Sequence, residues 1–267
     1  MGNDKKSKVL ETNESVYDGL AERHSKVVCY QSRKGTRDYL WDIIEKIHKN
    51  PGGGDLLEVA CGSGTFVELA KKWKMASYEG IDISGNMIKV ATKSHGSDKI
   101  KFYKSSLEDW EDGHKGKYDI IISSSFLHHL YDLDEGLEQI KSMLKPGGIY
   151  IGVHEVDNTR VTTRLEKFDL HWAVLMGHGY TGFWDRLRVF LKFMCSGKIF
   201  FKEKKSTARL QEDMVDFRLN EKFYLPDEPV IKRLHAKVVP YCFYNYPIFA
   251  RLKPINNFQM VVMKNDI

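Results

Sequence analysis

Between residues 55 and 155, short apolar runs alternate with stretches of helical spacing. The runs are mostly apolar at successive positions and not only at every second position, as in Leu56–Ala60 and Tyr118–Ser123. Strands that are buried on both faces have this composition, and alternation with helices is typical of a parallel sheet with helices on both sides. The pattern therefore predicts an α/β fold.

The same pattern gives the expected elements and their grouping. We expect strands at 56–60, 78–83, 100–103, 118–123 and 149–154, and helices at 66–73, 87–92 and 133–144. After Glu155 the pattern stops, and it resumes with a helix at 226–237 and strands at 238–244 and 258–264, the last of them antiparallel. Residues 1–13 are polar and expected to fray, whereas 37–48 carry an apolar helical stripe with Thr36 as candidate cap. The predicted parts are a helical cap (1–50), one α/β domain (51–158 and 226–267) and an inserted helical lid (159–225).

Composition and charge indicate the cellular compartment in which we expect the protein. The net charge is +5, and residues 151–267 hold the whole positive excess, with 19 basic and 13 acidic residues. The four cysteines have neither disulfide-scaffold nor zinc-ligand spacing, which is typical of a reducing compartment. The N-terminus lacks the apolar core of a signal peptide, and no apolar run has the length of a membrane span. We therefore expect a cytoplasmic location.

The sharpest motif is the glycine-rich turn after the first expected strand. Gly62 and Gly64 allow a sharp turn and a close approach of a ligand to the backbone, and the following helix presents free N–H groups. Asp82 ends the second strand, where a carboxylate can accept hydrogen bonds from ribose hydroxyls. A dinucleotide fingerprint is broken, because its third glycine would fall at Val67. Glu58 before the turn would repel a pyrophosphate, so a positively charged nucleoside is favoured.

Five ordered segments resemble the class I S-adenosylmethionine-dependent methyltransferases. The segments are Glu58–Gly64, Asp82, Ser84–Met87, Tyr118–Ile121 with Phe126–Leu130, and Leu144–Gly148. The resemblance implies a Rossmann-like, mostly parallel seven-stranded sheet with helices on both faces and a helical lid after the fifth strand. It also implies S-adenosyl-L-methionine as cofactor and S-adenosyl-L-homocysteine as product. The cofactor-binding residues it implies are Tyr17, Glu58, Ala60, Cys61, Gly62, Gly64, Asp82, Ile83, Met87, Ser106, Leu107, Ser123 and Ser124.

Two positions depart from the family pattern. Ala60 stands where the turn usually has its first glycine. Ser106 stands where the family usually has an aspartate that reads the adenine amino group. Ser106 itself, Glu108 or Asp109 remain candidates for that contact.

The implied reaction is an in-line displacement at an activated methyl group, in which orientation supplies much of the rate. A base is needed only if the acceptor arrives protonated. His154, at the end of the fifth strand, is the first candidate base and is expected to face the substrate. His129 and His128 are the other candidates, although His129 is more often an anchor for its loop. Glu155 and Asp157 have no matching acids elsewhere, so we expect no metal.

The acceptor is the least constrained part of the prediction. Residues 183–205 form an amphipathic segment with seven basic and two acidic residues. Such a segment suits a lid that packs on the domain, and it also suits contact with an anionic membrane surface. Its aromatic residues favour a small, hydrophobic or aromatic acceptor, methylated at oxygen, nitrogen or carbon. Nucleic acid is disfavoured, because Ser123–Phe126 replaces the tetrad of amino-methylating enzymes. An RNA methyltransferase and a non-catalytic cofactor-binding regulator remain alternatives, and the oligomeric state is left open.

Overall fold

The structure is a computed structural model. It describes residues 2–27, 34–47, 52–156, 225–241 and 258–266, together with Leu187, Leu191, Met194 and Cys195. The predicted lid, 159–225, lies almost wholly outside the described residues, and so does most of 183–205. The structure therefore gives no support to the predicted membrane contact, and the domain boundaries stay a prediction.

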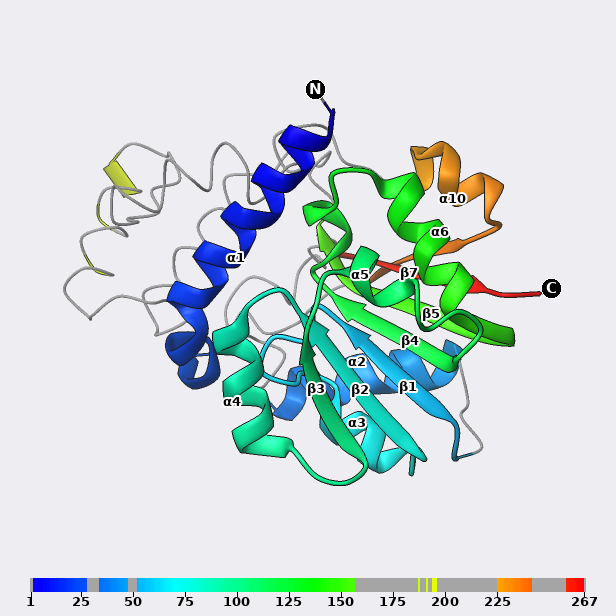
Figure 1. The fold of residues 1–267 in the computed structure, drawn as a ribbon, viewed down its shortest axis with the longest axis horizontal. Coiled ribbons are helices and arrows are strands. Elements are labelled where there is room, and N and C mark those ends of the chain that lie inside the picture. Colours follow the sequence, from blue (N-terminus) through cyan, green and yellow to red (C-terminus); the bar gives the residue numbers. More distant parts are fainter. Residues whose placement is uncertain are drawn as a thin grey trace.

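The centre of the fold is one sheet of seven strands (Figure 1). The strands are β1 (Asp55–Val59), β2 (Ser77–Asp82), β3 (Ile100–Lys104), β4 (Tyr118–Ser124), β5 (Leu144–Val156), β6 (Lys237–Tyr241) and β7 (Phe258–Lys264). Their order is β3-β2-β1-β4-β5-β7-β6, and β7 runs antiparallel to both of its neighbours while the pairs among β1 to β5 are parallel. The predicted mostly parallel sheet and its late antiparallel strand are confirmed.

Helices cover both faces of this sheet. The helices are α1 (Gly2–Val27), α2 (Lys34–Ile47), α3 (Val67–Lys72), α4 (Gly85–His95), α5 (Leu107–Glu111), α6 (Leu133–Met143) and α10 (Pro229–Arg233), with single turns η2 (Leu127–His129) and η4 (Leu225–Asp227). One core lies between the sheet and α2 and α3, with Ile44 and Leu69 fully buried. The other lies between the sheet and α5, α6 and α10, with Leu137 and Ile140 fully buried. Apolar strands are needed because both of their faces are covered.

Two helices differ from their predicted lengths. The N-terminal stretch expected to fray is part of α1, because one of its sides is buried, with Val9 2% and Asn13 4% exposed. The helix predicted at 226–237 is only α10, because the chain leaves the helical conformation at His235, where φ is 51°. Among the described helices, none combines the length and the apolarity that crossing a bilayer requires.

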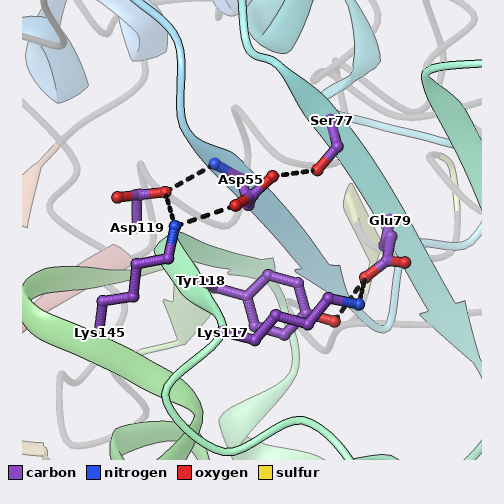
Figure 2. Close-up of polar contacts among 7 residues, drawn as sticks. All are labelled: Asp55, Ser77, Glu79, Lys117, Tyr118, Asp119 and Lys145. Atoms are coloured by element: carbon purple, nitrogen blue, oxygen red, sulfur yellow. Dashed lines mark hydrogen bonds and ion pairs between the residues drawn. The ribbon is translucent and has the colours of Figure 1, made fainter.

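Charged groups join the amino ends of the inner strands (Figure 2). The Lys145 ammonium lies 2.9 Å from the Asp55 carboxylate and 2.7 Å from that of Asp119, so one cation joins β5, β1 and β4. The Tyr118 hydroxyl donates to Glu79 at 2.6 Å, which links β4 to β2. These contacts link neighbouring strands at their amino ends, and the carboxyl ends that form the site lie at the opposite ends of the strands.

Candidate functional site

A cavity of about 250 Å³ lies at the carboxyl ends of β1, β2 and β4, beneath α1. Its floor is formed by the last residues of the strands and its roof by one side of α1. Ten of the predicted site residues line it: Tyr17, Ala60, Gly62, Asp82, Ile83, Met87, Ser106, Leu107, Ser124 and His129. Segments more than 100 residues apart in sequence therefore meet at one cavity.

Asp82 is the partly buried carboxylate of the cavity wall. One carboxylate oxygen accepts the Gly62 N–H and the other accepts the Ser84 N–H, each at 2.8 Å. Burial raises the pKa of Asp82, and these two N–H groups oppose that rise. A carboxylate oxygen can accept more than one hydrogen bond. Asp82 can therefore hold the glycine-rich turn and still accept from a ligand.

Glu58 is a predicted cofactor-binding residue, but its side chain is enclosed in the protein interior. Glu58 is 1% exposed, and its carboxylate accepts hydrogen bonds from the Phe66 N–H at 2.9 Å and from the Tyr78 hydroxyl. Burial raises its pKa to about 8. Glu58 is not among the described residues that line the cavity. Its contacts tie the turn to α3 and β2, so its observed role is to shape the turn.

The turn itself contains three residues in the left-handed region. Ala60 has φ 52°, Gly62 50° and Gly64 89°. A side chain at Gly64 would place its Cβ 3.1 Å from His95, which explains the glycine there. Ala60 holds a conformation that costs a residue with a Cβ roughly 1 kcal/mol. Cys61 is fully buried and, like Gly64, shapes the turn without lining the cavity.

Apolar side chains line the part of the cavity beside Asp82. Ile83 follows β2, Met87 lies in the first turn of α4 and Leu107 begins α5. Ser106 also lines this part, but it is the N-cap of α5. Its Oγ accepts the Asp109 N–H at 3.1 Å and donates to the Asp109 carboxylate at 2.7 Å. The hydroxyl that the sequence offers for base recognition thus has two partners within the chain.

Glu155 fixes the loop after β4. Its fully buried carboxylate accepts the N–H groups of Phe126 at 2.9 Å and Leu127 at 3.0 Å, and it lies 2.9 Å from Nδ1 of His128. Burial alone would raise the pKa of Glu155, but the contacts with His128 and the two N–H groups outweigh it and hold the pKa below its ordinary value. His128 is 4% exposed and is not among the described residues that line the cavity. The pair positions the loop that carries Phe126 and His129 to the cavity.

Tyr17 and His129 meet inside the cavity. The Tyr17 hydroxyl lies 3.0 Å from Nε2 of His129, and the two rings are arranged edge to face. Tyr17 comes from α1 and His129 from η2, so this contact joins the roof of the cavity to the loop after β4. Of the three candidate histidines, His129 is the one that lines the described cavity.

His154 is enclosed and lies away from the cavity, in contrast to the prediction that it faces the substrate. Its residue is 2% exposed, and it is not among the described lining residues. The pairing of β5 with β7 shifts register between Gly152 and Glu155, and His154 has φ 60°. This irregularity turns the side chain away from the direction that a regular strand would give it. Burial lowers the pKa of His154 to about 3, so the imidazole is neutral at ordinary pH.

Ser123 and Ser124 take opposite sides at the end of β4. Ser123 is fully buried, and its Oγ lies 2.8 Å from the Tyr150 hydroxyl. Ser124 lines the cavity. Successive side chains of a strand alternate between the faces, so of this predicted pair only Ser124 reaches the site.

The contribution of α1 was largely missed by the sequence analysis. Lys6, Val9, Leu10 and Asn13 line the cavity together with Tyr17. Their spacing of three and four residues places them on one side of a helix, and this signal is visible in the sequence. Among the described residues, no group of three or more histidine, cysteine or carboxylate side chains is arranged to hold a metal ion.

Ion pairs and hydrogen bonds attach α1 to the rest of the protein. Near its C-terminal end, the Asp18 carboxylate accepts the Ser84 hydroxyl at 2.5 Å and the Asn86 N–H at 3.0 Å. Near its N-terminal end, Lys6 lies 2.8 Å from the Glu108 carboxylate and 2.9 Å from that of Glu135. Polar contacts thus attach the roof of the cavity near both of its ends.

Comparison with known proteins gives the same fold. A family model described as a methyltransferase domain matches residues 32–186. A malonyl-[acyl-carrier protein] O-methyltransferase 2 from Ilyobacter polytropus is 29% identical over 99 residues, which are 36% of this chain and 38% of that protein. A ribosomal protein L11 methyltransferase from Dictyoglomus turgidum is 34% identical over 112 residues, which are 41% of this chain and 35% of that protein. The chain thus spans well under half the length of these curated relatives.

A solved structure extends the likeness to nearly the whole chain. The DhpI-SAH complex has a TM-score of 0.52 and 18% identity, and the superposition covers 95% of each chain. At this identity the likeness concerns the fold alone.

Proposed function

This chain belongs to the family of methyltransferase domains, and from that membership we propose that it transfers a methyl group from S-adenosylmethionine to a small, apolar or aromatic acceptor. The observation that carries the proposal is the cavity at the carboxyl ends of β1, β2 and β4, where the partly buried carboxylate of Asp82 faces an otherwise largely apolar wall. Ligands of open α/β sheets bind at this edge.

The residues present fit this cofactor. Asp82 has acceptor capacity beyond its two N–H partners, and it would hold the ribose hydroxyls. Ile83, Met87 and Leu107 offer apolar surface for the faces of the adenine ring. Gly62, with no side chain, allows the backbone to approach the ligand closely.

The bound cofactor would supply a methyl group that is already activated by a positively charged sulfur. The task of the chain is then to orient the acceptor and to exclude water, which α1 supports by covering the cavity. If the acceptor is an alcohol or a phenol, its proton needs a base. We assign that role to Nε2 of His129, which lines the cavity and contacts the Tyr17 hydroxyl at 3.0 Å. His128 and His154 are assigned structural roles, because both are enclosed.

The acceptor is inferred from the chemistry of the wall. Val9, Leu10, Phe126 and Leu130 give it apolar and aromatic surface. The curated relatives are named for acceptors as different as a carrier-bound malonyl group and a ribosomal protein, so their names do not select one. The wall favours a hydrophobic small molecule, and oxygen, nitrogen and carbon remain candidate acceptor atoms.

Calorimetric titration with S-adenosylmethionine, S-adenosylhomocysteine and NAD tests the cofactor assignment. We expect binding of the two adenosyl compounds and none of NAD. Labelled-methyl transfer onto lipid, small-molecule and RNA fractions then tests the acceptor class. Label in RNA would contradict the small-molecule assignment, and cofactor binding with no labelled product would favour a non-catalytic protein.

The variant Asp82→Ala tests the ribose contact. We expect its affinity for S-adenosylhomocysteine to fall by about tenfold or more, because hydroxyl groups of the ligand lose their acceptor. Asp119→Asn is the matched control, since it changes a carboxylate of the same sheet at the amino ends of the strands, away from the cavity. An unchanged dissociation constant in Asp82→Ala would remove Asp82 from the site.

A further inference from the structure

Asn13 places a buried amide oxygen at the cavity. The residue is 4% exposed and lines the cavity, and its Oδ1 has no hydrogen-bond partner within the part of the chain that the structure describes. A buried acceptor without a donor costs roughly 1–3 kcal/mol, and asparagine is also a poor residue for a helix interior. Its neighbours on the same side of α1, Val9 and Val16, are apolar. An apolar residue would therefore stabilise α1 better, and the asparagine points to a ligand that donates a hydrogen bond.

The contacts of α1 locate Asn13 within the cavity. Asp18 binds Ser84, just after β2, and Glu14 lies 2.6 Å from Lys104, at the end of β3. Lys6 lies 2.8 Å from Glu108 in α5. The helix thus passes over the end of β2, then the end of β3, then α5, and it lies beside α4 (Figure 1). Asn13, next to Glu14 in sequence, lies at the level of the segment that joins β3 to α5.

The sequence predicts that the segment between β3 and α5 recognises the adenine amino group. In the structure, the side chains of this segment that could accept a hydrogen bond already have partners. The Ser106 hydroxyl and the Asp109 carboxylate bind each other at 2.7 Å. Glu108 pairs with Lys6. All three candidates from the sequence therefore have contacts within the chain, and Asn13 brings an additional acceptor to the same part of the cavity.

We propose that the Asn13 carboxamide accepts a hydrogen bond from the exocyclic amino group of the cofactor's adenine. This inference rests on the proposed function, since it presumes an adenosyl ligand. The contact would make α1 a reader of the base as well as a cover for the cavity. Selectivity for adenine would then reside in the N-terminal helix and not in the segment after β3.

The test compares two ligands that differ only in the amino group. The dissociation constants of S-adenosylhomocysteine and of its analogue with unsubstituted purine in place of adenine are measured by calorimetry on the full chain. We expect the wild-type protein to prefer the amino-bearing ligand by about tenfold, a typical effect of one hydrogen bond lost in a buried site. Asn13→Leu, which keeps the branching and the number of side-chain heavy atoms and removes the acceptor, should bind the two ligands alike.

Glu14→Gln is the matched control. It removes the ion pair with Lys104 on the exposed side of the same helix, so it weakens the docking of α1 without touching the cavity. It should keep the tenfold preference. The melting temperature of ligand-free Asn13→Leu should not fall, because the substitution buries no polar group and favours the helix.

Three results would overturn the inference while leaving the proposed function intact. They are an unchanged preference in Asn13→Leu, an equal weakening of both ligands by that variant, and an effect confined to the KM of the methyl acceptor. If the wild-type protein binds neither ligand, the proposed function fails, and the inference fails with it.

Discussion

The enclosed imidazole of His154 should make the protein sensitive to mild acid. We expect the variant His154→Asn to remove part of that sensitivity. Asparagine is the chosen substitute because it tolerates the left-handed backbone that His154 adopts, with φ 60°. The variant also tests the original candidate base, and we expect its methyl-transfer rate to persist, since His154 does not line the described cavity.

The magnitude follows from the difference between the folded and unfolded states. Burial lowers the pKa of His154 from 6.5 to about 3, so the unfolded chain takes up a proton first as the pH falls. The stability that neutral His154 contributes is thus fully present above pH 6.5. It is lost progressively as the pH falls from 6.5 toward the pKa of His154 in the folded protein. One pKa unit corresponds to about 1.4 kcal/mol, so the loss is roughly 2 kcal/mol at pH 5 and roughly 3 kcal/mol at pH 4.

Urea denaturation at a series of pH values measures this effect. Between pH 8 and pH 5 the free energy of unfolding of the wild-type protein should fall by about 2 kcal/mol more than that of His154→Asn. His235→Asn is the matched control, because His235 has φ 51° but an exposed side chain, and its curve should run parallel to that of the wild type. Parallel curves for His154→Asn and the wild type down to pH 5 would refute the reasoning.

Three further substitutions probe contacts that stabilise the fold, each measured by urea denaturation. Glu155→Gln removes the carboxylate that holds the loop after β4, so it should lower the free energy of unfolding by roughly 3 kcal/mol, and a loss under about 1 kcal/mol would contradict the assigned role. Gly152→Ala would place a Cβ 2.5 Å from the Tyr150 hydroxyl and should cost about 1–3 kcal/mol, with a smaller cost when Tyr150→Phe is also present. An equal cost in both backgrounds would exclude that clash as the cause. Lys145→Met removes partly exposed ion pairs with Asp55 and Asp119 and should cost less than about 1 kcal/mol, so a larger loss would show that solvent screens this cluster less than we assume.

Much of the sheet could be predicted because its signal is local. A run such as Ile120–Ile122 is apolar on both faces, and the need to cover both faces sets the fold class. The ends of the strands and helices were harder to predict. The turn at Pro146 and Gly147 suggested a strand beginning at Ile149, whereas β5 begins at Leu144 and pairs with Tyr118 before the turn. Whether the residues before a turn belong to the strand depends on their pairing with the neighbouring strand. The sequence of a single segment does not reveal that pairing.

The candidate site likewise has parts that the sequence predicted and parts that it did not. The glycine-rich turn follows β1 and Asp82 ends the neighbouring strand β2, only 20 positions further along the chain, and the sequence predicted both. The orientation of His154 depends on a register shift against β7, whose partner residue Gln259 lies more than 100 positions away. The part of the wall that α1 supplies depends on ion pairs with α5 and α6. Such long-range contacts have no signature within either segment.

The attachment of α1 also has a consequence for the order of folding. Lys6 and its partner Glu135 are separated by 129 positions, so this contact closes a larger loop than the parallel pairs among β1 to β5, the longest of which joins Leu56 to Ile120. Loops of that size form late, after the local contacts that nucleate a domain. The parallel part of the sheet, β1 to β5, can therefore assemble while the cavity still lacks its roof. The capacity to bind a ligand should then appear in refolding as a slower phase, separate from the recovery of secondary structure.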